Sequence, residues 1–196
     1  MNTRLFTNRL QVLICLAVFF QVACNNNKKK LPADNQQENK TTADNDSFTK
    51  TWEYKTEKLE ELQPCSPDSL AGLLPGELAG APASGISSNN DMGASFAKSE
   101  YIPNDSVTFK LSVYDCAGAE GAGILNRQFV SMLNTNDEKN TRIIDFKGSK
   151  AIEYFDPEDR EGRITYFTGR FLVSLEGKIL SADELKRVAR EIRLKN

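Results

Sequence analysis

The chain has 196 residues and contains no histidine. This absence removes the commonest general base, the commonest metal ligand and every Ser-His or Cys-His nucleophile pair. The formal net charge is −2, so the basic excess with which proteins neutralise a nucleic-acid backbone is also missing. The apolar run Val12 to Phe20 would rise only about 14 Å as a helix, too little for a bilayer core of about 30 Å.

The first 23 residues have the layout of a secretory signal peptide. Arg4 and Arg9 give a positive start, a short apolar core follows, and Ala23 is small. An ordinary cleavage site also needs a small residue at the third position before the cut, which Gln21 does not provide. A plain secretory signal therefore explains the segment only in part.

The residue after this segment, Cys24, completes the assignment. The stretch "FFQVAC" resembles the lipobox of bacterial lipoproteins, although Gln21 stands where that motif usually has a leucine-like residue. The resemblance implies that Cys24 becomes the first mature residue and carries lipid on its sulfur. Two or three acyl chains, such as palmitate, anchor a protein stably. Because Asn25 is not aspartate, the resemblance also implies the outer membrane, with the domain facing the periplasm.

The sequence predicts a lipidated, disordered tether over 24–50 and a single domain over 51–196. The tether is rich in Asn, Lys, Asp and Thr and has few large apolar residues, so it cannot bury enough surface to offset its ordering entropy. Apolar residues become frequent after residue 50, and that segment is long enough to form one core.

Helical and strand patterns both occur within 51–196. "WEYKTEKLEEL" is helical in composition, and Ser66 with Pro67 forms a helix start signal before a short helix that Pro75 and Gly76 end. "VTFKLSVYD" alternates like a half-buried antiparallel strand, and "GASFAKSEYI" is expected to pair with it. "APASGISSNNDMG" is expected to be loop. "ILNRQFVSMLN" has helical spacing.

Further strands are expected at "RIIDF", "AIEYF", "RITYF" and "RFLVSLE", with the last two forming either a hairpin or one long bent strand. The C-terminal "SADELKRVAREIRL" begins with a capping box, Ser181 and Glu184, and carries an apolar stripe. The predicted class is α+β: an antiparallel sheet packed by the C-terminal helix and one or two further helices. The closing strand–turn–helix resembles small extracytoplasmic domains of unknown function. The whole order is loosely similar to PsbP-like proteins, which implies an α/β/α sandwich.

Cys65 and Cys116 are the only thiols of the mature domain once Cys24 is lipidated. In an oxidising compartment an isolated pair of this kind is expected to form a disulfide. Closing the loop between them should stabilise the domain by ~4 kcal/mol in the chain-entropy model. A redox pair would be expected to have C-x-x-C spacing, which this pair lacks.

Two segments invite a binding interpretation and are explained more simply. "CAGAEGAG" has the glycines of a phosphate-cradling loop but not the Lys-Ser/Thr ending, so a flexible connection is favoured, with Gly118, Gly121 and Gly123 as the positions to test. "DPEDREG" holds Asp156, Glu158, Asp159 and Glu161, but its spacing does not fit a calcium loop. A solvated turn is expected there.

Three other residues are candidates for chemistry. Two of the acids of "DPEDREG" could serve as a glycosidase-like carboxylate pair, and Asp115, at a strand end, is the only other acid of interest, although a turn role suffices for it. "DSL" and "DSV" resemble an O-glycosylation acceptor of some Gram-negative lipoproteins, which implies Ser69 and Ser106 as acceptors.

These observations predict a lipid-anchored protein of the cell envelope that acts as a non-catalytic interaction or accessory module. We expect a membrane contact through the N-terminal lipid, a protein partner in the envelope, no cofactor, no metal and no nucleic acid. One alternative is a lipoprotein that binds a small molecule between sheet and helices. The other is a carboxylate-based hydrolase of the envelope.

Overall fold

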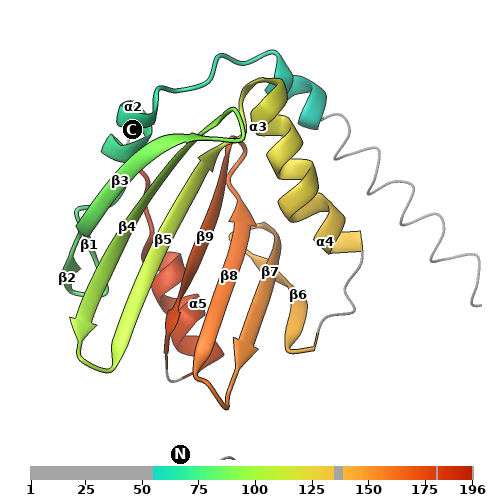
Figure 1. Ribbon diagram of the computed structural model, residues 1–196. Coiled ribbons are helices and arrows are strands. Elements are labelled where there is room, and N and C mark those ends of the chain that lie inside the picture. Colours follow the sequence, from blue (N-terminus) through green and yellow to red (C-terminus); the bar gives the residue numbers. More distant parts are fainter. Residues whose placement is uncertain (1–54, 135–138, 180, 196) are drawn as a thin grey trace, which may run out of the picture. The chain divides into compact units, whose positions relative to one another are not determined.

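The computed structural model describes residues 55–134, 139–179 and 181–195. The predicted signal peptide, Cys24 and the predicted tether lie outside these residues. The described part is an α+β fold: a seven-stranded antiparallel sheet, a small two-stranded sheet and a few helices (Figure 1). No helix in this part is long and apolar enough to cross a membrane.

The large sheet has the strand order β3-β4-β5-β9-β8-β7-β6, and every neighbouring pair is antiparallel. Its strands are β3 (Ser84–Asp91), β4 (Ala94–Asn104), β5 (Val107–Asp115), β6 (Thr141–Phe146), β7 (Ser149–Asp156), β8 (Glu161–Phe167) and β9 (Phe171–Lys178). The expected strands from 94 onward are confirmed, and β8 with β9 is a hairpin, not one long strand. The small sheet pairs β1 (Glu77–Leu78) with β2 (Ala81–Pro82).

Two of the helices begin where the sequence signals place them, after Ser66 and after Ser181. A helix over 55–60 is followed by α2 (Pro67–Gly72), α3 (Gly118–Leu125), the π-helix η1 (Asn126–Val130), α4 (Ser131–Asn134) and α5 (Ala182–Glu191). The Ser66 hydroxyl accepts a hydrogen bond from Ser69 N at 3.2 Å, and the Ser181 hydroxyl accepts one from Glu184 N at 3.2 Å. Both predicted N-caps are therefore confirmed.

Apolar residues are buried on both sides of the sheet, but unequally. On one side α2 and α5 cover a large cluster that includes Phe109, Leu111 and Val113 of β5. Figure 1 shows α5 behind the strands in this view. On the other side the helical run α3-η1-α4 covers a smaller cluster around Leu125 and Phe129. Further along the strands, this second side carries polar residues that are exposed or half-buried, and none of the helices in the described part covers them (Figure 1).

Two loop predictions are wrong. Residues 81–93 were expected to be loop but contain β2 and β3. Strand β3 is at the sheet edge and is exposed along most of its length, so it lacks the apolar alternation that identifies half-buried strands. The segment expected to be a flexible glycine-rich connection contains α3, because its glycines allow close packing, as described below.

Candidate functional site

Charged side chains of alternating sign form a row across the uncovered side of the sheet. Glu100 of β4 is opposite Lys110 of β5, and Lys110 is opposite Glu176 of β9. Glu176 is opposite Arg163 of β8, and Arg163 is opposite Tyr154 of β7. Adjacent strands are about 4.8 Å apart, so the sign of the charge alternates at that spacing. We call these four charged residues, together with Tyr154 at the end, the charged row.

No ion pair joins the members of the charged row among the described residues. Arg163 lies over the ring of Tyr154, with 6.0 Å from Cζ to the ring centroid. The acid beneath α5 differs: Glu153 is buried, its Oε2 lies 2.6 Å from Arg142 Nε, and its Oε1 lies 3.8 Å from Lys186 Nζ. The charged row therefore presents uncommitted charges, whereas Glu153 uses its charge inside the fold.

Three hydroxyl side chains form the neighbouring row. Ser112 of β5 is opposite Ser174 of β9, which is opposite Thr165 of β8. The Thr165 and Ser174 hydroxyl oxygens are 3.1 Å apart and share a hydrogen bond, and all three residues are half-buried. We call these three residues the hydroxyl row. It lies between the charged row and the residues that α3-η1-α4 covers.

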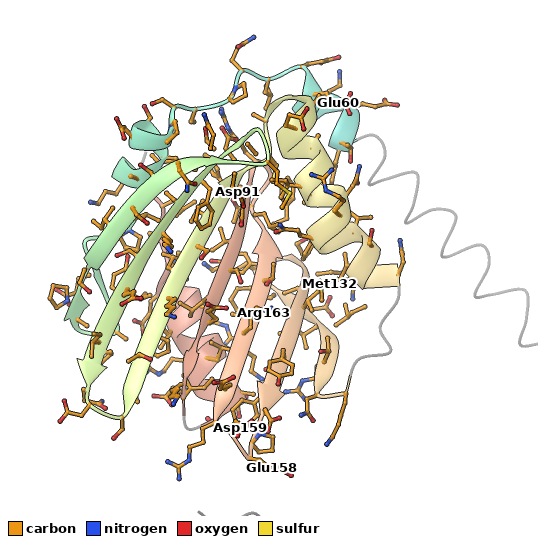
Figure 2. The ribbon with its side chains drawn as sticks, viewed as in Figure 1. Glu60, Asp91, Met132, Glu158, Asp159 and Arg163 are labelled. Atoms are coloured by element: carbon orange, nitrogen blue, oxygen red, sulfur yellow. The ribbon has the colours of Figure 1, made fainter. Side chains whose placement is uncertain are left out.

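A cleft of about 320 Å³ lies over the hydroxyl row, and we call it the sheet cleft. Phe96 and Tyr114 line one part, with ring centroids 4.5 Å apart and ring planes at 39°. Met132 of α4 forms part of its wall, and Arg163 and Glu176 also line it. Figure 2 shows Arg163 partway along β8 and Met132 on α4, at the side of the sheet.

The Tyr114 hydroxyl donates to Asp91 Oδ2 at 3.1 Å. Burial raises the pKa of Tyr114, and the hydrogen bond to Asp91 and the Asp91 charge raise it further. The phenol is therefore neutral at physiological pH. It holds the end of β5 to Asp91 at the end of β3, and it fixes one aromatic wall of the sheet cleft.

The acid singled out in the sequence, Asp115, lies on the other side of β5 and is fully buried. Its carboxylate accepts from Arg170 Nε at 2.9 Å and Arg170 Nη2 at 2.8 Å. It also accepts from the backbone N–H of Cys65 at 2.7 Å and of Ala117 at 3.1 Å. Arg170 Nη2 donates in addition to the Gln63 carbonyl at 2.9 Å. These bonds join the segment before α2, the end of β5 and the β8–β9 turn.

This arrangement suits a structural role for Asp115. Burial alone would raise the pKa of Asp115, but the Arg170 hydrogen bonds, the N–H groups of Cys65 and Ala117, and the Arg170 charge together lower it. A general acid needs a raised pKa and access to the substrate. Asp115 has a lowered pKa and four donors on its two oxygens, so nothing in its surroundings favours the hydrolase hypothesis.

The predicted disulfide partners are both free thiols in the structure. Cys65 is partly buried beside the α2–α5 cluster and its sulfur is 3.2 Å from Arg170 Nη2. Cys116 is fully buried in the cluster beneath α3, on the other side of the sheet. The two segments do meet, since Cys65 binds Asp115, the residue before Cys116. The disulfide stays a prediction.

Neither thiol has the features of a reactive nucleophile. Burial raises the pKa of Cys65, the Asp115 charge raises it further, and the Arg170 charge only partly opposes them. Burial raises the pKa of Cys116 to about 12. The thiolate is the reactive form, so neither thiol is activated as a nucleophile by its surroundings.

The glycines of "CAGAEGAG" serve packing at the start of α3. A Cβ on Gly121 would lie 2.5 Å from the Asp115 carbonyl oxygen and 2.6 Å from the Cys116 carbonyl carbon, so the backbone would have to shift to accommodate it. Gly118 has φ +74°, a value that favours glycine. Gly123 lies beside the Arg127 guanidinium. These residues bring α3 against the end of β5, and we see no phosphate cradle in this arrangement.

The remaining candidates lie at the surface. Asp156 accepts hydrogen bonds from the backbone of Glu158 and Asp159 in the exposed β7–β8 turn, the solvated turn expected there. Figure 2 shows Glu158 and Asp159 at the lower end of the sheet. Ser69 in α2 and Ser106 in the β4–β5 turn are exposed. No cluster of acids and cysteines suited to a metal ion occurs in the described part of the chain.

The sequence interpretation did not identify the charged row or the hydroxyl row as a site. The alternation predicted for "VTFKLSVYD" does imply that Lys110 and Ser112 lie on the outer side of their strand. The sequence signal that could have identified this site is that several strands of one sheet each have a polar outer side. Combining those sides requires the strand order, since β9 lies between β5 and β8.

Comparison with known proteins adds little. No protein-family profile matches the chain, and no curated protein matches it significantly. The chain is similar to the crystal structure of a GTP binding regulator from Thermotoga maritima, at 14% identity, with 66% of this chain and 90% of that chain covered and a TM-score of 0.39. A similarity at this level supports no argument about fold or function.

Proposed function

We propose that this chain is a lipid-anchored, non-catalytic binding module of the cell envelope. Cys24 carries the lipid, residues up to about 50 form the tether, and the domain faces the periplasm from the outer membrane. The uncovered side of the sheet, with its charged row, is the surface that binds an envelope partner. We also propose that the helices on the two sides of the sheet correspond to an α/β/α sandwich of the PsbP-like kind.

The observation that carries this proposal is the set of uncommitted charges on the charged row. Exposed charges of both signs at fixed spacing give orientation and specificity to a partner more than raw affinity. Interior acids such as Glu153 and Asp115 are paired within the fold, whereas the charged members of the charged row form no ion pair with one another among the described residues. The sheet cleft beside it also supports the alternative of a small-molecule binder.

The anchor is tested by replacing Cys24 with serine in the full chain. We expect Cys24→Ser to move the protein from the membrane fraction to the soluble fraction, or to leave it unprocessed, because serine cannot form the thioether. The readout is membrane fractionation with mass measurement of the mature N-terminus. Unchanged fractionation together with an unlipidated N-terminus would refute lipidation as the anchor.

The binding surface is tested by purifying the lipidated chain from its own membranes and identifying what accompanies it by mass spectrometry. Glu176→Lys converts the alternating row into one with three adjacent positive charges and should remove the accompanying molecule. Glu158→Lys changes the charge equally but lies in the exposed β7–β8 turn, so it is the matched control. Retention of the same molecule by Glu176→Lys would show that the uncovered side is not the binding surface.

A further inference from the structure

We propose that the sheet cleft binds a neutral glycan segment. This inference rests on the proposed binding function and names the class of ligand. The argument uses four properties of the cleft: its hydroxyl floor, the balanced charge at its rim, its aromatic wall, and its continuation along the sheet.

The floor of the cleft consists of groups that both donate and accept hydrogen bonds. Ser112, Ser174 and Thr165 contribute three hydroxyls in cross-strand register. Thr165 and Ser174 bond to each other, and Ser112 Oγ makes no hydrogen bond within the described residues. A hydroxyl has one donor hydrogen and two acceptor lone pairs. A ligand that is itself rich in hydroxyls matches this floor in any local orientation.

The charges that line the cleft cancel. Arg163 and Glu176 are opposite each other on β8 and β9, and they are the only charged residues that line it among the described residues. The guanidinium supplies donors only and the carboxylate supplies acceptors only. Neighbouring hydroxyls of a sugar ring can accept from the first and donate to the second. A phosphate or a polyanion would instead be expected to meet an excess of positive charge.

The rest of the lining is mostly apolar. Phe96 and Tyr114 contact each other there, and the remaining residues are apolar Leu172, Met132 and Ile152 and the amide of Gln128. Sugar rings have one face of C–H groups that can pack against aromatic rings, which bury a large apolar area. An apolar wall beside a polar floor therefore fits an amphipathic ring better than it fits an inorganic ion.

The cleft continues into a second hollow, which allows a chain of rings to pass. The sheet cleft has a volume of about 320 Å³, at the small end of the range of ~300–1,000 Å³ for ligand sites. A hollow of about 420 Å³ begins at the same Arg163 and Glu176 and extends past Lys110 and Tyr154. A polymer lying along the strands would contact both hollows.

The test is a titration of the full lipidated chain in detergent with maltotetraose, cellotetraose and chitotetraose, and separately with inorganic polyphosphate, by calorimetry. We expect saturable binding of at least one neutral oligosaccharide and none of polyphosphate. Glu176→Gln should weaken binding at least about tenfold, because a site that loses its hydrogen-bond partner discriminates strongly. Glu158→Gln is the matched control and should bind like the natural chain.

Thermal melting of each variant separates loss of the ligand from loss of the fold. As a second variant, Ser174→Ala removes one floor hydroxyl with little change in volume and should weaken binding in the same direction. Binding of none of the three oligosaccharides would overturn the glycan inference, and so would binding that Glu176→Gln leaves unchanged. If Glu176→Lys still abolishes co-purification of a protein from membranes, the binding surface stands and its ligand is that protein.

Discussion

Replacing Asp115 with asparagine should test how strongly one buried ion pair stabilises the contact between the segment before α2, the end of β5 and the β8–β9 turn. The substitution keeps the shape of the side chain but removes its charge and turns one acceptor oxygen into a donor. The Arg170 guanidinium then loses its counter-charge, and one of the two backbone N–H groups of Cys65 and Ala117 loses its acceptor. The substitution therefore removes an ion pair and a backbone hydrogen bond at the same time.

The expected magnitude follows from burial. Removing one partner of a buried ion pair costs about 3–5 kcal/mol. Asp115 is 0% exposed, but the Arg170 side chain is 32% exposed, so water restores part of its solvation. We therefore expect Asp115→Asn to lower the free energy of unfolding by about 3 kcal/mol, the lower end of this range.

The pH dependence gives a second, independent result. The pKa of Asp115 is lowered in the folded chain, below the value of about 3.9 for an unfolded aspartate. The unfolded chain therefore takes up the proton first as the pH falls. The stabilisation is complete above about pH 5 and is lost as the pH falls through 3.9 towards the folded-state pKa. The difference in free energy of unfolding between the natural chain and Asp115→Asn should therefore become smaller as the pH falls through this range.

The assay is urea unfolding of both proteins at pH 7 and at several values down to pH 3. Asp145→Asn is the control, because Asp145 forms an ion pair with Lys150 at 2.7 Å but its side chain is 86% exposed. That pair should contribute between zero and about 1 kcal/mol. The reasoning would be refuted if Asp115→Asn cost no more than Asp145→Asn, or if its effect did not change with pH.

Two further predictions concern the same region. Cys116 is fully buried with a pKa of about 12, so it should resist thiol reagents whether or not it is bridged. Cys65 is therefore the informative residue. A disulfide predicts that Cys65 is not labelled in the native oxidised protein, and labelling of Cys65 would contradict the bridge. Gly121→Ala should lower the free energy of unfolding by about 2–3 kcal/mol, because its Cβ meets backbone atoms that cannot move freely. Gly72→Ala, with no atom within 4 Å of the new Cβ, should be neutral or slightly stabilising in the same unfolding assay, and equal losses would contradict the packing argument.

The elements with strong local signals could be predicted from the sequence. Ser66 and Ser181 cap helices as expected, and β5 shows the predicted alternation of buried and outward residues. Strand β3 could not be predicted, because its residues are small and polar and its conformation depends on main-chain bonds to β4. The local residue preferences of this segment do not indicate a strand, and its conformation is set by pairing with β4 at the sheet edge.

The candidate site could be predicted only in pieces. Asp115 was recognised as an unusual acid at a strand end, but its partner Arg170 comes from a turn far away in the chain. The charged row needs four strands in the right order before Glu100 and Arg163 lie on one surface. Long-range pairings of this kind produce no pattern in the local sequence. The glycines of α3 do form a visible pattern, but the sequence analysis interprets it as flexibility and not as close packing.

The central place of β9 has a consequence for how the protein is made. Successive strands within β3-β4-β5 and within β6-β7-β8 are joined by turns, but in the sheet only β9 hydrogen-bonds to both groups, and it follows the other six strands in the chain. Non-local pairing is slow, and contacts of high sequence separation form late. The sheet therefore cannot close until β9 has emerged from the ribosome. Until then, β5 and β8 both present unpaired edges that could associate with other chains.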